Sequence, residues 1–288
     1  MERVIFHCDL NSFYASVELL DHPELRHLPV AVCGDPESRH GIILAKNEPA
    51  KKFQVQTAET IWQAKRKCPD LVLLPAHHRV YREFSRRINQ MYQDYTDLVE
   101  PFGIDESWLD VTASTSIKGD GMKIAKEISS RIKYELGVTV SIGVSWNKIF
   151  AKLGSDYKKP DAITEFSKDN YKDIAWKLPV GDLLMVGRST ERTMKKLGIC
   201  TIGDLAGAEP SILETYLGKM GLVLHTFANG WDKTPVSVEG YRAPIKSIGN
   251  STTTPRDLVS ELDVKIILMA LSESVGARLR ENGFQCRT

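Results

Sequence analysis

The chain has 288 residues, 42% of them hydrophobic and 26% charged, which is long enough for two or three domains with hydrophobic cores. Its five cysteines lie far apart with no CxxC pair, which excludes a disulfide scaffold and a structural zinc site and predicts buried thiols in a reducing cytosol. The formal net charge is only +1, so any nucleic-acid-binding surface must be locally basic and balanced elsewhere.

A short strand followed by a helix is predicted at the N-terminus. Residues 4–8 form an apolar run, and apolar residues recur at helical spacing over 13–20 after the candidate N-caps Asn11 and Ser12. Asp9 therefore lies where a strand gives way to a helix, a position at which open sheets present ligands. A simple helix-capping role for Asp9 is equally consistent with this pattern.

Residues 21–75 predict a small segment of strands and helices. Residues 29–33 and 41–45 are typical of strands, and 59–68 is typical of a helix. A longer helix is predicted over residues 80–95.

Two adjacent carboxylates, Asp105 and Glu106, follow within an apolar stretch. In an extended strand, neighbouring side chains point to opposite faces, so a turn or bulge is needed to aim both at one point. Carboxylates held together repel each other unless a cation lies between them, and hard oxygen ligands favour magnesium or manganese. The pair also fits an exposed acidic turn between two strands.

The next segment predicts a helix over 122–136, a strand over 138–144 and a second helix capped by Ser145. Lys148 and Lys152 lie four residues apart on one face of that second helix, where they can flank the same negative charge. Strands interleaved with helices make this part an α/β or α+β core.

A domain boundary is predicted near residues 164–167, followed by helices. One helix ends at Gly198, which suits a left-handed C-cap, and another begins shortly afterwards. This pattern fits a helix-hairpin-helix unit whose turn amides grip a phosphate, with a looser second copy over 216–231. An ordinary helical bundle is the alternative.

The remaining chain predicts a polar linker up to residue 243, a strand over 245–249 and a helix over 258–279. A second strand is expected to begin where the chain stops, so we expect a fragment or a truncated protein.

Three ordered motifs resemble those of the Y-family translesion DNA polymerases, and bacterial polymerase IV-like members of that family most closely. They are Asp9-Leu10-Asn11-Ser12-Phe13-Tyr14, then Gly103-Ile104-Asp105-Glu106 with Gly103 in place of the usual serine, and finally residues 141–148 with 151–153 and 159–160. The resemblance runs along the whole chain.

The resemblance implies an α+β, multidomain right-hand polymerase. Its expected parts are a palm (1–20 and 76–166), small fingers (21–75), a helix-hairpin-helix thumb (167–232), a linker (233–243) and a partial little finger (244–288).

The resemblance also implies functional residues. The catalytic carboxylates would be Asp9, Asp105 and Glu106, which with the backbone carbonyl of Leu10 would hold two Mg²⁺ ions, replaceable by Mn²⁺. Nucleotide-binding residues would be Phe13, Lys46, Lys51, Lys159 and the sugar-gating Tyr14. DNA-binding residues would be Lys148, Lys152, Gly187, Arg188 and Ser189.

Three further positions depart from the family pattern. Glu48 and Lys51 stand where members commonly have a tyrosine and an arginine that bind the triphosphate, which predicts weak nucleotide capture. Met185 takes the place of the first hairpin glycine, which puts a tight amide nest in doubt.

The expected function is template-directed addition of dNMP from dNTP to a primer 3′-hydroxyl during DNA damage tolerance and repair. Alternatives are a palm-type two-metal nuclease or nucleotidyl cyclase, and a catalytically weak or inactive DNA-binding paralogue. Expected partners are primer–template DNA, dNTP and a sliding clamp bound through residues beyond this chain. With neither a signal peptide nor a membrane-length apolar run in the sequence, we expect a monomeric, cytoplasmic, nucleoid-associated protein.

Overall fold

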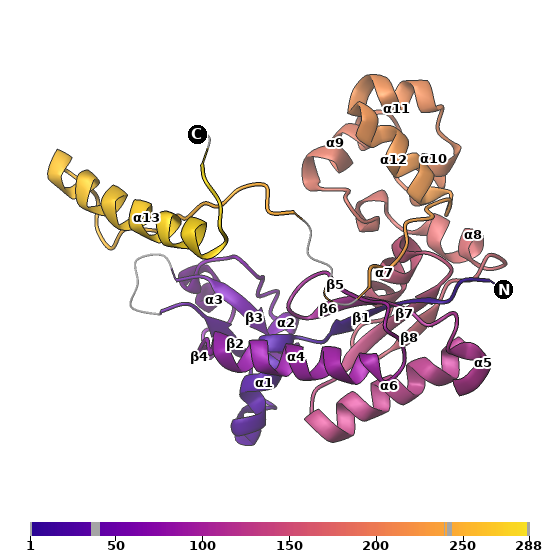
Figure 1. Ribbon diagram of the computed structural model, residues 1–288, viewed down its shortest axis with the longest axis horizontal. Coiled ribbons are helices and arrows are strands. Elements are labelled where there is room, and N and C mark those ends of the chain that lie inside the picture. Colours follow the sequence, from indigo (N-terminus) through magenta and orange to yellow (C-terminus); the bar gives the residue numbers. More distant parts are fainter. Residues whose placement is uncertain (1, 36–40, 239, 241–243, 287–288) are drawn as a thin grey trace. The chain divides into compact units, whose positions relative to one another are not determined.

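The computed structural model describes residues 2–35, 41–238, 240 and 244–286 (Figure 1). The chain divides into two compact units. The first unit comprises Met1–Glu24 and His77–Tyr241, and the second comprises Leu25–Ala76 and Arg242–Thr288.

A five-stranded sheet with the order β5-β6-β1-β7-β8 forms the centre of the first unit. The strands are β1 (Ile5–Leu10), β5 (Val99–Pro101), β6 (Glu106–Asp110), β7 (Val140–Ser145) and β8 (Ile163–Glu165). β1 pairs antiparallel with both β6 and β7, and β8 runs parallel to β7. All six residues of β1 are buried, because helices cover both faces of the sheet.

The helices α4 (His78–Gln93) and α6 (Gly121–Leu136) cover one face, and α7 (Lys148–Tyr157) covers the other (Figure 1). α7 approaches very closely because β7 has Gly143 at the contact. A Cβ at Gly143 would lie 1.8 Å from the carbonyl oxygen of Ala151 in α7. The side chain of His7, opposite Gly143 in β1, therefore faces α7.

The C-terminal part of the first unit is helical. Its helices are α8 (Tyr171–Ile174), α9 (Arg188–Lys196), α10 (Ile202–Gly207), α11 (Pro210–Leu217) and α12 (Lys219–Ala228). Gly198, with φ +79°, has the predicted left-handed conformation after α9, and Thr201 and Asp204 form a capping box on α10. α11 and α12 meet at Gly218, within the stretch predicted to hold a second hairpin.

The segment after α12 packs against the sheet, whereas the sequence predicted a polar linker. Arg3 donates to the carbonyl oxygens of Lys233 (3.4 Å) and Thr234 (3.1 Å). The side chain of Val236 is buried in the core, and the next amide, of Ser237, donates to Glu100 at 2.8 Å. Residues 232–238 are therefore held on the first unit along their length.

The described part of the second unit contains a three-stranded sheet with the order β3-β2-β4, together with helices. These elements are β2 (Val30–Cys33), β3 (Ile43–Lys46), β4 (Val72–Pro75), α2 (Glu48–Lys52), α3 (Ile61–Lys67) and α13 (Glu261–Glu281). The Asn47 side chain joins sheet and helix, because its Oδ1 accepts from the amides of Val30 (2.9 Å) and Ala50 (3.1 Å). Across the described ranges, no helix is both long and apolar enough to cross a membrane.

Three local predictions were wrong. Asn147, not Ser145, caps α7, because Ser145 still belongs to β7 and its hydroxyl donates to the Phe166 carbonyl. Residues 245–249 form no strand, since no other described residue of the chain pairs with them. Cys200 and Cys286 are exposed, whereas Cys8, Cys33 and Cys68 are buried as predicted.

Candidate active site

The carboxylates of Asp9 and Glu106 are brought together by strand pairing. The two residues are direct partners in the β1–β6 ladder and therefore point to the same face, the one covered by α7. Asp105 lies in the bend just before β6, as the sequence predicted, and its carbonyl accepts from the Leu10 amide at 3.0 Å. Because Asp105 lies outside β6, its side chain does not have to point to the face of the sheet opposite Glu106.

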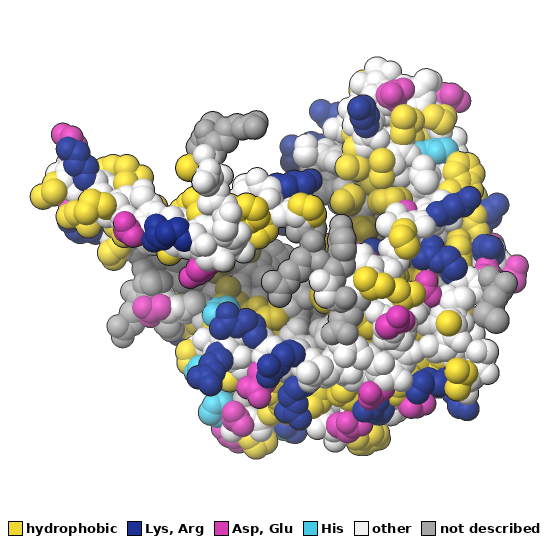
Figure 2. All heavy atoms as spheres, viewed as in Figure 1, with side chains coloured by type: hydrophobic (Ala, Val, Ile, Leu, Met, Phe, Trp, Pro, Cys, Tyr) yellow, Lys and Arg dark blue, Asp and Glu magenta, His cyan; other side chains and the backbone are white. Residues whose placement is uncertain are grey.

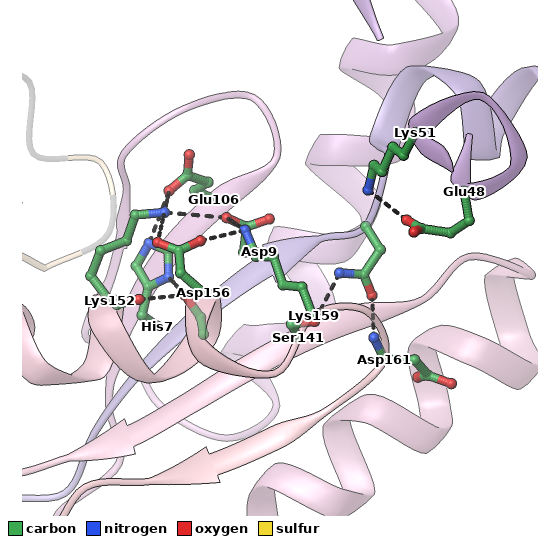
Figure 3. A network of polar contacts seen from close by, with 12 residues as sticks. His7, Asp9, Glu48, Lys51, Glu106, Ser141, Lys152, Asp156, Lys159 and Asp161 are labelled. Atoms are coloured by element: carbon green, nitrogen blue, oxygen red, sulfur yellow. Dashed lines mark hydrogen bonds and ion pairs between the residues drawn. The ribbon is translucent and has the colours of Figure 1, made fainter. Parts of the chain in front are cut away.

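Two lysines and a third aspartate complete the cluster (Figure 3). Lys152 Nζ from α7 lies 2.7 Å from Glu106 Oε2, 3.2 Å from Asp9 Oδ2 and 3.2 Å from Asp156 Oδ2. Lys159 Nζ lies 2.7 Å from the same Asp9 oxygen and 2.6 Å from Asp156 Oδ1. The expected nucleotide contact Lys159 and the expected DNA contact Lys152 thus both lie among the carboxylates.

The site strongly perturbs the acidity of its groups. Burial, together with the charges of Asp9 and Glu106, raises the pKa of Asp105 to about 6. Burial alone would also raise the pKa of Glu106, but hydrogen bonds from His7 and Lys152 outweigh it and lower this pKa to about 2. Burial would lower the pKa of Lys152, yet the charge of Asp156 and the hydrogen bond to Glu106 raise it.

These residues fit divalent cations. Four carboxylates face two ammonium groups in this cluster, which leaves negative charge uncompensated. The ammonium of Lys152 stands between Asp9 and Glu106, so a cation is favourable at that point. The donors are hard oxygens of the kind that magnesium and manganese prefer.

The aromatic pair at the start of α1 (Phe13–Asp21) has one buried and one accessible member. Phe13 is 3% exposed and packs in the core, whereas Tyr14 is half-buried. The Tyr14 ring stacks on Tyr81, with centroids 4.1 Å apart at 14°, and contacts His78 edge-on. Burial and the nearby charge of Asp105 raise the pKa of Tyr14, which places its ring beside the carboxylates.

Asn11 is a functional candidate that the sequence reasoning missed. Its Oδ1 accepts from the Asp161 amide (2.8 Å) and the Thr139 hydroxyl (3.0 Å), and its Nδ2 donates to Ser141 Oγ at 2.8 Å. These bonds hold the loop that carries Lys159 against β1. Its place two residues after Asp9 was the only signal in the sequence.

Lys148 is not available to a DNA phosphate, contrary to expectation. Its side chain is 9% exposed, its Nζ lies 2.6 Å from Glu100 Oε1, and it stands 4.3 Å from the Trp108 ring centroid. The helix α7 turns this lysine toward β5 and β6 rather than toward solvent. In this structure Glu100 and Trp108 occupy Lys148 in place of the expected DNA phosphate.

The other expected DNA contacts lie at the start of α9, far along the chain from the carboxylates. Gly187 is the N-cap of α9, and Arg188 and Ser189 begin the helix with exposed side chains. An open hollow of about 530 Å³ lies beside this helix, lined mainly by basic side chains, and Figure 2 shows Lys and Arg gathered there. The lining residues are Arg188, Glu191, Arg192, Lys195 and Lys196. The low net charge of the chain means that a DNA-binding surface must be locally basic, and the side chains beside α9 form such a surface.

Met185 adopts the left-handed conformation that a glycine would favour, with φ +70°. Met185 thus stands in place of the expected glycine, but its backbone still has the left-handed conformation that a glycine would favour.

The expected triphosphate contacts Lys46 and Lys51 belong to the second unit. Lys51 pairs with Glu48 one helical turn away on α2, and Lys46 Nζ donates to Thr57 Oγ1 at 2.9 Å. Glu48 therefore neutralises the lysine that stands in place of the family's arginine.

Comparisons with known proteins agree with the resemblance. The model of the impB/mucB/samB family matches residues 8–156, and that of its C-terminal domain matches residues 245–288. DNA polymerase IV of Acetivibrio thermocellus is 58% identical over 288 residues, which cover 100% of this chain and 72% of that protein. DNA polymerase IV 1 of Bacillus subtilis is 44% identical over 278 residues, covering 96% of this chain and 67% of that protein.

Solved structures with the same fold are also Y-family enzymes. A Y-family DNA polymerase chimera of Dbh and Dpo4 matches with a TM-score of 0.85 and 26% identity, covering 95% of this chain and 80% of that one. DinB from Sulfolobus solfataricus matches with a TM-score of 0.75 and 28% identity, covering 82% of this chain and 69% of that one. An insertion ternary complex of Dbh DNA polymerase matches with a TM-score of 0.75 and 28% identity, covering 81% of this chain and 69% of that one. With this match along its length, the chain belongs to the impB/mucB/samB family, the Y-family of translesion DNA-directed DNA polymerases, and within it to the polymerase IV-like members.

Proposed function

We propose that this polymerase transfers dNMP from dNTP to a primer 3′-hydroxyl with the help of two divalent metal ions, and that it acts in DNA damage tolerance and repair. The observation that carries the proposal is the convergence of Asp9, Asp105 and Glu106 with Lys152 and Lys159 at one end of β1 and β6. The relatives named DNA polymerase IV and the solved insertion ternary complex support it. Monomeric action, a sliding-clamp contact and a nucleoid-associated location stay predictions from the resemblance.

The carboxylates would hold the metal ions. Asp9 and Asp105 would ligate both ions, Glu106 would complete the ion at the primer end, and the Leu10 carbonyl would complete the ion on the triphosphate. When bound, such ions make the primer hydroxyl more acidic and neutralise charge on the triphosphate. Burial is the main reason for the high pKa of Asp105, and repulsion by Asp9 and Glu106 adds to it; bound ions would relieve that repulsion.

Lys159 would change partners when metal and nucleotide bind. Lys159 is held here by Asp9 and Asp156. If Asp9 held a metal ion, the Lys159 ammonium would be free to bind the triphosphate, and Asp156 would keep it near. Lys152 would remain beside Glu106 and limit the repulsion between the carboxylates.

Tyr14 would select the sugar. Its ring is half-exposed beside Asp105 and is backed by the fully buried Tyr81, so it cannot move aside easily. A ribose 2′-hydroxyl would clash with such a fixed ring.

A primer-extension assay with Mg²⁺, a labelled primer–template and each dNTP tests the proposal. Asp9→Asn and Asp105→Asn should abolish incorporation while leaving primer–template affinity within a few-fold of wild type, because only the metal ligands are lost. Asp97→Asn, at an exposed carboxylate outside the cluster, is the matched control and should extend normally. Near wild-type extension by either cluster variant would refute the assignment.

A further inference from the structure

His7 is fully buried, alone among the histidines that the structure describes, and the proposed chemistry gives it no role. It lies in β1 two residues before Asp9, and both its ring nitrogens have polar partners. Nδ1 lies 2.7 Å from Ser155 Oγ of α7, and Nε2 lies 3.1 Å from Glu106 Oε2 of β6 (Figure 3).

The direction of these hydrogen bonds follows from counting hydrogens. The ionised carboxylate of Glu106 can only accept, so the hydrogen between it and His7 must be on Nε2. If the ring is neutral, Nδ1 is bare and accepts from the Ser155 hydroxyl. If the ring is charged, Nδ1 donates to Ser155, whose hydroxyl then donates to the Lys152 carbonyl at 2.8 Å. In both states the hydrogen on Nε2 is the one nearest Glu106 Oε2, with Nε2 itself 3.1 Å away, although the contact falls short of regular hydrogen-bond geometry in the metal-free protein.

The ring has little freedom to turn. Trp108 packs edge-on against it, with centroids 5.2 Å apart at 65°. On the other side, the missing side chain of Gly143 lets α7 approach, and a Cβ there would lie 2.4 Å from the Ser155 amide nitrogen. Ser155 thus reaches the ring only because β7 has a glycine opposite His7.

Two nitrogens therefore lie close to Glu106 Oε2, His7 Nε2 at 3.1 Å and Lys152 Nζ at 2.7 Å, and neither contact has regular hydrogen-bond geometry. The Lys152 ammonium also lies close to the carboxylates of Asp9 and Asp156. Among the described residues, Glu106 is the carboxylate with which His7 forms an ion-pair contact. The histidine is thus the donor that distinguishes Glu106 from its neighbours.

We infer that His7 is the positioning residue for Glu106: it fixes the carboxylate in one orientation, so that the side chain is preorganised to ligate a divalent ion. The chain Ser155–His7–Glu106 has the form of the outer-sphere hydrogen bonding that orients metal ligands elsewhere. This inference rests on the proposed function, because it assumes that Glu106 binds metal.

The test is Mn²⁺ binding to the protein without DNA or nucleotide, measured from the electron paramagnetic resonance signal of free Mn²⁺. His7→Phe keeps the ring shape without a donor and should weaken Mn²⁺ binding about 10- to 100-fold. His7→Gln retains a donor and should recover part of that loss. Ser145→Ala removes another buried hydrogen bond of the same sheet and should leave Mn²⁺ binding unchanged.

A double-mutant cycle separates positioning from general damage. In a Glu106→Gln background, His7→Phe should cause no further loss, because the carboxylate that His7 orients for the ion is already gone. Equal Mn²⁺ affinity in His7→Phe and wild type, or the same loss in both backgrounds, would overturn the inference. If His7→Phe fails to fold, Ser155→Ala decides: it leaves His7 in place but frees the ring, and wild-type Mn²⁺ affinity in that variant would overturn the inference too.

The same data separate this inference from the proposed function. Wild-type Mn²⁺ binding by Glu106→Gln would refute the metal site itself. Weak binding by Glu106→Gln with normal binding by His7→Phe would refute only the role of His7.

Discussion

Asp105 and Glu106 are neighbours in the chain, but their charges have opposite effects on the stability of the metal-free protein. The pKa of Asp105 is raised to about 6 from 3.8, so the folded state holds its proton more tightly than the unfolded state. Stability from this group is therefore lost as the pH rises from about 4 to about 6. The pKa of Glu106 is lowered to about 2 from 4.5, so its contribution is present above about pH 4.5 and is lost as the pH falls.

Asp105→Asn should therefore stabilise the metal-free protein while destroying activity. The raised pKa of Asp105 corresponds at most to about 3 kcal/mol, which we reduce to about 1–2 kcal/mol because the side chain is partly exposed. Urea unfolding in EDTA at pH 7.5 measures the gain, which should nearly vanish at pH 4. Asp97→Asn should show no such gain, and a less stable Asp105→Asn would contradict the stated origin of the pKa.

Tyr14→Ala should raise ribonucleotide incorporation relative to deoxyribonucleotide by at least tenfold, since discrimination by clash depends on the bulk of the ring. Single-nucleotide insertion with rNTP and dNTP measures the ratio of kcat/KM values. Phe13→Ala is the comparison, because the buried Phe13 should affect stability far more than sugar choice. A ratio unchanged in Tyr14→Ala would mean that the ring only packs.

At the scale of elements, the turn before α9 is formed by a residue that does not favour it. Met185 has φ +70°, and its side chain is 61% exposed, so little packing offsets the unfavourable backbone conformation. Met185→Gly should therefore raise the free energy of unfolding by about 0.5–1 kcal/mol, after the greater entropy of glycine in the unfolded chain is counted.

Urea unfolding measures this change, and the chain offers a matched control. Met220 lies in the first turn of helix α12 and is 41% exposed, so Met220→Gly should lower stability by about 0.5 kcal/mol. Equal effects of the two substitutions would show that the turn at Met185 carries no strain.

Most helices and strands were predicted to within a few residues, because hydrophobic periodicity is local. The helix predicted over 80–95 is α4, and that over 122–136 is α6. The misplaced cap at Ser145 shows the limit: both Ser145 and Asn147 are good N-cap residues, and only the pairing of β7 with β1 keeps Ser145 in the strand. The predicted strand over 245–249 failed for the same reason, since a strand needs a partner.

For the whole molecule, Glu100 connects the segment after α12 to the core. It pairs with the buried Lys148 and accepts the Ser237 amide. Burial alone would raise the pKa of Glu100, but these hydrogen bonds lower it, so its stabilising effect is lost as the pH falls through the acid range.

Glu100→Ala should lower stability by about 2–3 kcal/mol, because it leaves the Lys148 ammonium buried without a partner. It should also release residues 232–238, so that trypsin cleaves faster after the exposed Lys233. Limited proteolysis followed by mass spectrometry measures this rate. Glu214→Ala, at an exposed carboxylate of α11, is the control and should change neither the stability nor the cleavage rate. Unchanged cleavage in Glu100→Ala would show that the contacts of Arg3 and Val236 are enough to hold residues 232–238 in place.

The sequence by itself determined which carboxylates are candidates, which family the chain resembles and where most elements lie. These follow from motifs and periodicities within short windows of the chain. The tertiary structure decided which cations face Asp9 and Glu106, that Lys148 is buried, that residues 232–238 dock on the sheet, and that His7 and Asn11 support the site. Each of these depends on α7 packing against β1 through Gly143, or on other contacts between residues far apart in sequence, and local patterns do not encode which distant side chains meet.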